Sequence, residues 1–203
     1  MATQTLTRPP ADQVEKQIQK LRELYADAPE VGRVALENLV DNMKDGTISP
    51  QEMSSAGRRG ARRGKVSEFT MVLPLAKGGA KRFKEILAAG INVDAPDRVG
   101  SVHDMRFVFL DNDTRVLFAT TYDGEWSPYI DDFATHIPDE LDLMFSNCEG
   151  WPGVRSPAVK DYIAKYQYTA SGWYVAQPNL TVRDSKRLEK IGTAAEEFLD
   201  KIQ

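Results

Sequence analysis

Residues 101–124 read SVHDMRFVFLDNDTRVLFATTYDG. Apolar side chains alternate with other residues on both sides of Asn112-Asp113, and such a dipeptide is typical of a tight turn between strands. The stretch therefore predicts a β-hairpin of two long strands, and the other elements can be placed by asking which face of this hairpin they cover.

The position of the turn sets the register of the hairpin and so decides its two faces. One face is expected to pair Phe109 with Val116, Phe107 with Phe118, Met105 with Thr120 and His103 with Tyr122. This face is mostly apolar and should lie under helices. For His103 two interpretations stay open: a catalytic or ligand role, and a core histidine bonded to the Tyr122 hydroxyl.

The opposite face is expected to pair Val108 with Leu117, Arg106 with Ala119, Asp104 with Thr121 and Val102 with Asp123. A few polar groups beside an apolar wall are what a small-molecule site needs. Arg106 could hold an anion or a developing oxyanion, and Asp104 or Asp123 could act as a base if burial raises its pKa. A salt bridge within the sheet, or a dimer contact, is the competing interpretation.

Further strands and helices are predicted on both sides of the hairpin. Strands are expected over residues 68–75 and 169–176, and a helix over residues 78–90. Helices starting at Ser127 and Ser156 follow the cap-then-proline rule, and Pro138 restarts the first of them. A closing helix over residues 181–202 should turn its apolar side inward.

This order is β-α-β-β-α-β, which predicts an α+β fold of the ferredoxin-like class with a four-stranded antiparallel sheet. An N-terminal helical extension precedes it and the C-terminal helix follows it. We expect the boundary after residue 65, which gives an extension with a basic linker (1–65) and a ferredoxin-like domain (66–203).

The predicted extension contains two amphipathic helices, over residues 11–25 and 29–43. Residues 41–52 resemble the calcium loop of an EF-hand, although Met43 stands where an oxygen ligand is needed. A helix end at Gly46 followed by a capping box at residues 49–52 explains the same letters without calcium. The basic run RRGARRGK, from Arg58 to Lys65, lacks aromatic residues and is interpreted as a solvated linker rather than an anion or nucleic-acid contact.

Composition excludes several classes of protein. The formal net charge is -4, which gives no general reason to bind nucleic acid or an anionic membrane. Cys148 is the single cysteine, so neither an internal disulfide nor a thiolate zinc cluster is expected. The sequence shows neither a signal peptide nor an apolar run long enough to span a bilayer, and we expect a cytoplasmic protein without a metal.

Residues 68–176 resemble the dimeric α/β-barrel superfamily in the order of their elements. The strand FTMVLPL before Lys77-Gly78-Gly79, the strand HDMRF and the later Tyr122-Asp123-Gly124 look like segments of uncharacterised bacterial members. The superfamily includes antibiotic-biosynthesis monooxygenases, chlorite dismutase-like proteins and dye-decolourising peroxidases. The resemblance implies a homodimer in which two sheets pack face to face around a cavity.

The resemblance also brings haem into consideration. Residues 120–124, TTYDG, partly match the Gly-x-x-Asp-Gly motif of dye-decolourising peroxidases, in which the aspartate serves distal chemistry, but Thr120 replaces the first glycine. The two histidines of the chain, His103 and His136, would be the candidate axial ligands. The position of His136 near a helix end favours a structural role for its ring.

We therefore expect a small-molecule enzyme that carries out an oxidative or acid–base conversion of a hydrophobic or aromatic substrate, as monooxygenase-type oxidoreductases do. Arg106, Asp104, Asp123 and His103 are the candidate catalytic residues, and Thr121, Tyr122, Trp126 and Trp151 are the candidate substrate-binding residues. A cofactor is either absent or haem. The alternatives are a haem peroxidase or chlorite dismutase-like protein, and a non-catalytic binding or assembly protein.

Overall fold

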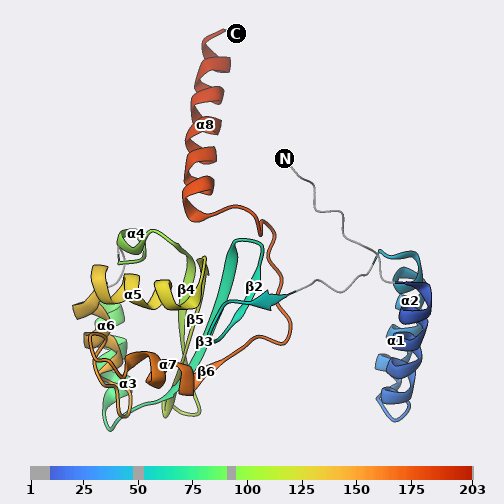
Figure 1. The fold of residues 1–203 in the computed structure, drawn as a ribbon, viewed down its shortest axis with the longest axis horizontal. Coiled ribbons are helices and arrows are strands. Elements are labelled where there is room, and N and C mark those ends of the chain that lie inside the picture. The colour runs from blue at the N-terminus through green and yellow to red at the C-terminus, as the bar shows by residue number, and fades with distance from the viewer. Residues whose placement is uncertain (1–9, 48–52, 91–94, 203) are drawn as a thin grey trace. The chain divides into compact units, whose positions relative to one another are not determined.

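The computed structural model describes residues 10–47, 53–90 and 95–202 of the chain. It divides into two compact units, residues 1–52 and residues 53–203 (Figure 1). The predicted boundary at residue 65 therefore lies too far along the chain. The residues between 53 and 65 belong to the second unit because they form two short strands of its sheet, β1 (Ser54–Ser55) and β2 (Ala61–Arg63).

The first unit is the predicted pair of helices, α1 (Ala11–Leu24) and α2 (Glu30–Asp45). Ile18 and Val40 are buried in it, and Arg22 and Glu37 form an ion pair with 2.6 Å between Nη2 and Oε2. Gly46 ends α2 in the left-handed conformation, with φ of 83°. The proposed calcium loop at 41–52 extends through residues 48–52, which lie outside the described residues.

The second unit is an α+β fold built on an antiparallel sheet. Its long strands are β3 (Val66–Pro74), β4 (Val102–Leu110) and β5 (Arg115–Asp123). The sheet order is β1-β2-β3-β5-β4, and a short strand, β6 (Gln167–Tyr168), also pairs with β3. β3 therefore has β5 along one edge, while β2 and β6 share its other edge.

The predicted last strand at 169–176 is wrong, and β6 ends at Tyr168. A longer β6 would need the edge of β3 at Ser67 and Val66, but Arg62 and Arg63 of β2 already pair there. Beyond Tyr168 the backbone is held by side chains instead: the N–H of Ala170 donates to the Glu68 carboxylate at 2.9 Å. Residues 169–176 include aromatic and β-branched residues, which favour strands, but no free edge of β3 is left for them to pair with.

Helices cover one face of the sheet (Figure 1). They are α3 (Gly79–Ala88), α5 (Trp126–His136), α6 (Pro138–Phe145) and α7 (Val159–Tyr166). The core lies between these helices and the sheet. Phe118 is at its centre, stacked on Phe107 with ring centroids 5.0 Å apart and edge-on to Phe145 at 5.5 Å. The sequence analysis missed a short helix, α4 (Ala95–Val99).

The hairpin of β4 and β5 has the predicted register from Asp104 to Phe109, including the pairs Phe107 with Phe118 and Arg106 with Ala119. Asp111, Asn112 and Asp113 form the turn, all with positive φ. A β-bulge between Val102 and Asp104 breaks the register, so that Val102 and not His103 pairs with Tyr122. The expected helix-facing position of His103 is therefore wrong, because one extra residue turns its side chain away from the core.

The last helix, α8 (Val182–Lys201), forms where it was predicted but does not turn its apolar side inward. Val182 is buried, whereas residues 185–202 are exposed along the whole length of the helix. In the described part of the chain, none of the helices combines the length and hydrophobicity that a membrane span requires.

Candidate functional site

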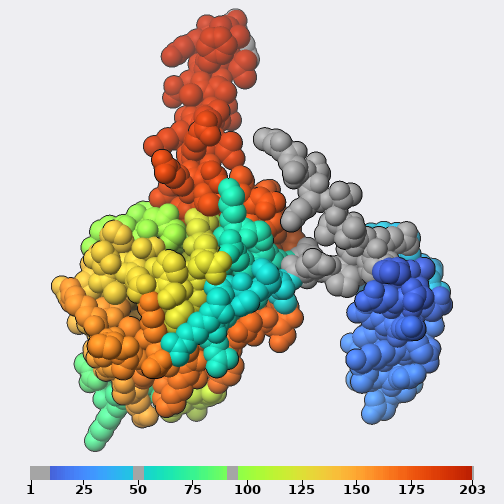
Figure 2. Space-filling view, viewed as in Figure 1, coloured from blue at the N-terminus to red at the C-terminus, as the bar shows by residue number. Residues whose placement is uncertain are grey.

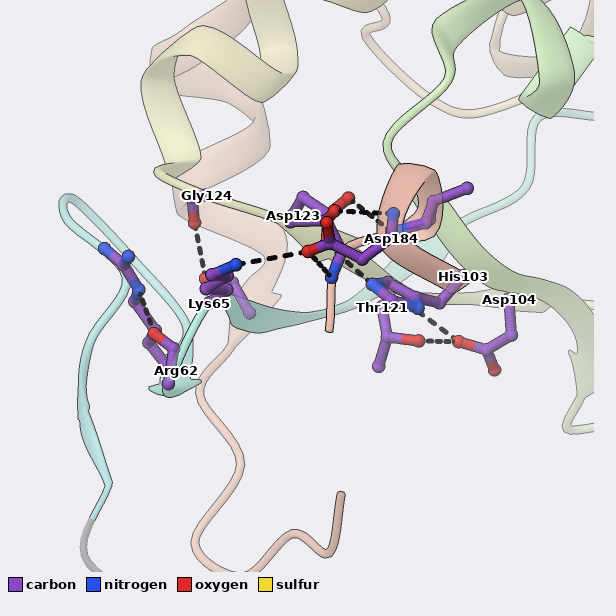
Figure 3. Close-up of polar contacts among 12 residues, drawn as sticks. Arg62, Lys65, His103, Asp104, Thr121, Asp123, Gly124 and Asp184 are labelled. Carbon is purple, nitrogen blue, oxygen red and sulfur yellow. Dashed lines mark hydrogen bonds and ion pairs between the residues drawn. The ribbon is translucent and has the colours of Figure 1, made fainter. Parts of the chain in front are cut away.

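The sheet face that points away from the helices carries the predicted polar residues, at the end where β4 starts and β5 ends (Figure 3). We call it the open face. Asp104 and Arg106 come from β4, and Thr121 and Asp123 come from β5. The bulge adds His103 to this group. The structure therefore brings together all four of the candidate catalytic residues. Asp104 and Arg106 have the predicted register, whereas the predicted pairing of Val102 with Asp123 is wrong because the bulge pairs Val102 with Tyr122.

His103 and Asp123 form the most closely fixed pair of the open face. His103 Nε2 lies 2.7 Å from Asp123 Oδ1, and the two side chains are 24% and 16% exposed. The second oxygen of Asp123 accepts a hydrogen bond from the backbone N–H of Val182, at 2.9 Å. Because both oxygens are engaged, the carboxylate orients the ring and leaves Nδ1 as the nitrogen available to a bound molecule.

Asp104 and Arg106 lie next to each other along β4. Arg106 Nη1 is 2.5 Å from Asp104 Oδ2, and the other oxygen of Asp104 accepts from the N–H and the hydroxyl of Thr121, at 2.9 Å for the N–H. The Arg106 and Asp104 side chains are 62% and 45% exposed. An ion pair this exposed contributes little to stability. Breaking it to bind an anionic ligand would therefore cost little, and the exposed guanidinium can be reached from solvent.

The expected apolar pocket does not enclose these groups. Val108 is 44% exposed on the same face, with Leu117 beside it on β5, so the apolar part of the open face is a surface. A cavity of about 30 Å³ lies instead on the helix side of the sheet, and its lining is entirely apolar. It is lined by Phe69, Met71, Phe118, Tyr129, Ile130, Phe133, Leu141, Phe145, Trp151, Val154 and Ile163.

The aromatic candidates do not reach the open face. Tyr122 and Trp126 are fully buried; Tyr122 stacks on Tyr129 at 3.7 Å, and the indole N–H of Trp126 donates to Gln167 at 2.6 Å. Burial raises the pKa of Tyr122 well above its ordinary value. Trp151 lines the apolar cavity and donates to Asp142 at 2.8 Å. These positions make all three parts of the core rather than of a site beside Arg106.

The geometry does not fit haem. An axial histidine has to stand at an apolar slot wide enough for a porphyrin. His103 lies on the polar end of the open face with Nε2 engaged by Asp123, and His136 is exposed at the end of α5. The apolar cavity has a volume on the order of two water-sized spheres and neither histidine lines it. Among the described residues, no group of three or more His, Cys, Asp or Glu side chains could hold a metal ion.

The structure adds residues that the sequence analysis did not single out. Glu68 is buried at 3% exposure beside Thr121, and its carboxylate accepts from the N–H groups of Ala61 and Ala170, both at 2.9 Å. The start of α8 lies next to His103 (Figure 3), fixed by a capping box of Thr181 and Asp184. The spacing of Thr181 and Asp184 is the sequence signal for this cap.

The basic run from Arg58 to Lys65 is not a linker. Three of its charges are paired within the second unit: Arg58 with Asp161 at 2.5 Å, Lys65 with Asp184 at 3.1 Å, and Arg62 with Glu125. These partners lie about 60 to 120 residues further along the chain, so local sequence could not show them. These ion pairs join the run to α7, to the start of α5 and to the start of α8.

Comparison with known proteins assigns no role to this site. No protein-family model, curated protein or solved structure matches the chain. The resemblance to the dimeric α/β-barrel superfamily therefore stays a hypothesis, and the function has to be argued from the open face itself.

Proposed function

We propose that this protein is a small-molecule enzyme that performs acid–base chemistry on the open face of its sheet. The contact between His103 and Asp123 is the observation that carries the proposal, because a carboxylate that orients an imidazole is the arrangement of a general acid or base.

The substrate would combine an anionic or carbonyl group with an apolar body. Arg106 offers a charge-assisted donor beside the His103–Asp123 pair, and Val108 and Leu117 continue the same face as an apolar surface. A hydrophobic or aromatic carboxylate or keto acid matches this order of groups. Redox chemistry of the substrate's own carbanion with oxygen is a variant of the same proposal, because it also begins with removal of a proton.

We also propose that the sheet is ferredoxin-like. The neighbours β6, β3, β5 and β4, all antiparallel, support this, because that fold places its fourth, first, third and second strands in this order. A homodimer remains part of the proposal, since a second copy could cover the open face. The single free thiol, Cys148, supports a reducing compartment such as the cytoplasm.

Exchange of carbon-bound protons with solvent tests the proposed chemistry. Phenylpyruvate in D₂O is a suitable probe, because its benzylic protons exchange when a base removes them, and proton NMR follows their loss. The protein is expected to accelerate exchange over buffer alone. His103→Gln is expected to lower the protein-dependent rate by about 100-fold or more. His136→Gln, which changes the other histidine, is the matched control and should leave the rate unchanged.

Arg106→Ala separates binding from proton transfer. Loss of a hydrogen bond to a charged group is expected to raise KM for phenylpyruvate about 10-fold or more while kcat changes less. If the protein accelerates no exchange, or if His103→Gln exchanges as fast as the wild type, the acid–base proposal is wrong. Oxygen uptake that depends on both Arg106 and His103 would favour the oxidative variant.

A non-catalytic role is supported by one specific observation. The same Asp123 that orients His103 also accepts from the first helical N–H of α8, so the pair could serve only to join the sheet to this helix. In that case His103→Gln should lower the unfolding midpoint and weaken α8, with no probe turned over by the wild type. Far-UV circular dichroism and urea unfolding of His103→Gln distinguish the two roles.

A further inference from the structure

The apolar cavity on the helix side of the sheet takes no part in the proposed chemistry. Phe69 and Met71 of β3 and Phe118 of β5 line one side of it, and residues of α5, α6 and α7 line the others. In Figure 2, atoms of α5, in yellow, and of the segments that follow it, in orange, are packed against one another in this helical layer. The cavity is therefore a space within the core, separated from the open face by the sheet.

The described lining of the cavity offers no hydrogen bond to a bound molecule, because its O–H and N–H groups are engaged elsewhere. Tyr129 Oη lies 3.1 Å from Thr120 Oγ1. The indole N–H of Trp151 donates to Asp142 at 2.8 Å. Burial raises the pKa of Tyr129 well above its ordinary value, which agrees with surroundings that exclude water. A buried water needs about two to four polar partners, so water is disfavoured in this cavity.

The side chains around the cavity are held in place by their neighbours. Tyr129 stacks on Tyr122 with ring centroids 3.7 Å apart and meets Phe133 edge-on at 4.6 Å. The rings of Phe145 and Trp151 are in contact, with centroids 5.1 Å apart. Because these rings cannot turn into the cavity without losing such contacts, the space is part of the folded structure. A preformed apolar space of this kind needs no rearrangement before it binds a ligand.

The size of the cavity limits what it can hold. Its volume of about 30 Å³ corresponds to roughly two water-sized spheres, whereas a cavity that binds benzene has a volume of roughly 150 Å³. An aromatic ring is therefore too large, and a diatomic molecule or a two-carbon hydrocarbon fits. Transfer of such an apolar molecule from water into apolar surroundings is favourable, and the aromatic rings of the lining add dispersion contacts.

The cavity comes nearest to solvent beside Trp151. This residue is half-buried, while the other lining residues that the structure describes are buried. Its position is set by Asp142, whose carboxylate also accepts from the N–H of Val154 at 2.7 Å. A small molecule would therefore enter beside this indole.

We propose that this cavity binds dioxygen and other apolar molecules of the same size, such as ethane. The observation that carries the proposal is a dry, preformed space with aromatic walls and the volume of a diatomic molecule. The proposal goes beyond the acid–base function and does not depend on it, because the cavity and the open face lie on opposite sides of the sheet.

The first test measures where dioxygen collects in the full-length wild-type protein. Dioxygen is paramagnetic and accelerates the NMR relaxation of methyl groups close to it, so methyl-labelled protein is compared under dioxygen and under the same pressure of nitrogen. Met71 and Ile130 line the cavity, whereas Leu73 and Val116 are at least as buried but do not line it. The enhancement of relaxation is expected to be at least about 3-fold larger at the two lining residues.

The second test fills the cavity. Val154→Ile and Val154→Leu each add one carbon to a residue of the lining, and each should lower the enhancement at Met71 and Ile130 to the level of Leu73. Val159→Ile is the matched control, because Val159 is buried in the same core but does not line the cavity. It should leave the enhancement as it is in the wild type. Near-UV circular dichroism checks that the core is packed in each variant.

Three outcomes overturn the proposal. One is an enhancement at Met71 and Ile130 that is no larger than at Leu73 and Val116, since dioxygen would then not collect in the cavity. Another is a nuclear Overhauser effect between water and the lining methyl groups, which would show that the cavity is hydrated. The third is an enhancement that persists in both Val154 variants although their cores are packed, because the bound molecule would then lie elsewhere.

Discussion

Asp123 is the residue at which the sheet and the C-terminal helix meet. Its two oxygens serve different purposes, since one contacts His103 and the other accepts from the N–H of Val182. Replacing Asp123 would therefore change both the orientation of the imidazole and the anchoring of α8. For this reason His103→Gln, which leaves the carboxylate and the helix cap in place, is the sharper test of catalysis.

Cys148 shows how burial controls reactivity at a single side chain. Its thiol is 3% exposed, and burial raises its pKa to about 12. Because the thiolate is the reactive form, we expect the native protein to resist iodoacetamide at pH 8. Mass spectrometry should find one carbamidomethyl group after labelling in denaturant and almost none without it. Full labelling of the native protein within minutes would contradict the described burial.

The residue-scale predictions from sequence were right where strand alternation decided them. Asp104, Arg106 and Thr121 lie together because the Asn112-Asp113 turn sets the pairing of the two strands. His103 was misplaced because alternation assumes that no strand has an extra residue. Tyr122 and Trp126 were assigned to a substrate site by residue type, whereas the register places Tyr122 under the helices and packing buries Trp126.

At the scale of elements, the start of α8 depends on a charged carboxylate. Asp184 accepts from the backbone N–H of Thr181, and this bond, with help from Lys65, lowers the pKa of Asp184 from 3.8 to about 2. A pKa that is lower in the folded than in the unfolded chain means that the charged form stabilises the fold. This contribution is present above about pH 4 and disappears as the pH falls towards 2.

Asp184→Asn should remove this pH dependence. Urea unfolding at a series of pH values between 2 and 6 measures it, as the difference between the wild type and the variant. We expect the wild type to be the more stable protein above pH 4 and the difference to shrink below that pH. A constant difference across the series would show that Asp184 does not act through its charge.

The elements differed in how much the sequence could reveal. Helices α3 and α6 have local start and end signals, and both lie close to their predicted positions. β2 and β6 are short and depend on which strand occupies the edge of β3, which is a matter of tertiary structure. For α8 the periodicity predicts the helix correctly, but no local pattern can say whether the apolar side will find a partner within the chain.

At the scale of the whole molecule, the chain consists of two units with separate buried side chains. The hydrophobic core of the second unit is built from residues between Phe69 and Tyr166, and the first unit buries Ile18 and Val40. We expect a chain of residues 53–203 to fold alone. Its urea midpoint should be close to the midpoint at which the second unit unfolds in the full protein. Near-UV circular dichroism tests whether its aromatic core is packed; loss of that signal would contradict the division.

The β-bulge at His103 has a consequence for how the gene can change. Deleting one codon at this point would restore regular alternation along β4 while leaving Phe107 and Phe109 in their places in the core. The protein would still fold, but no histidine would lie beside Asp123. Folding and the proposed chemistry thus depend on different residues of this strand, so descendants of this chain could lose the His103–Asp123 pair in a single event and keep the domain.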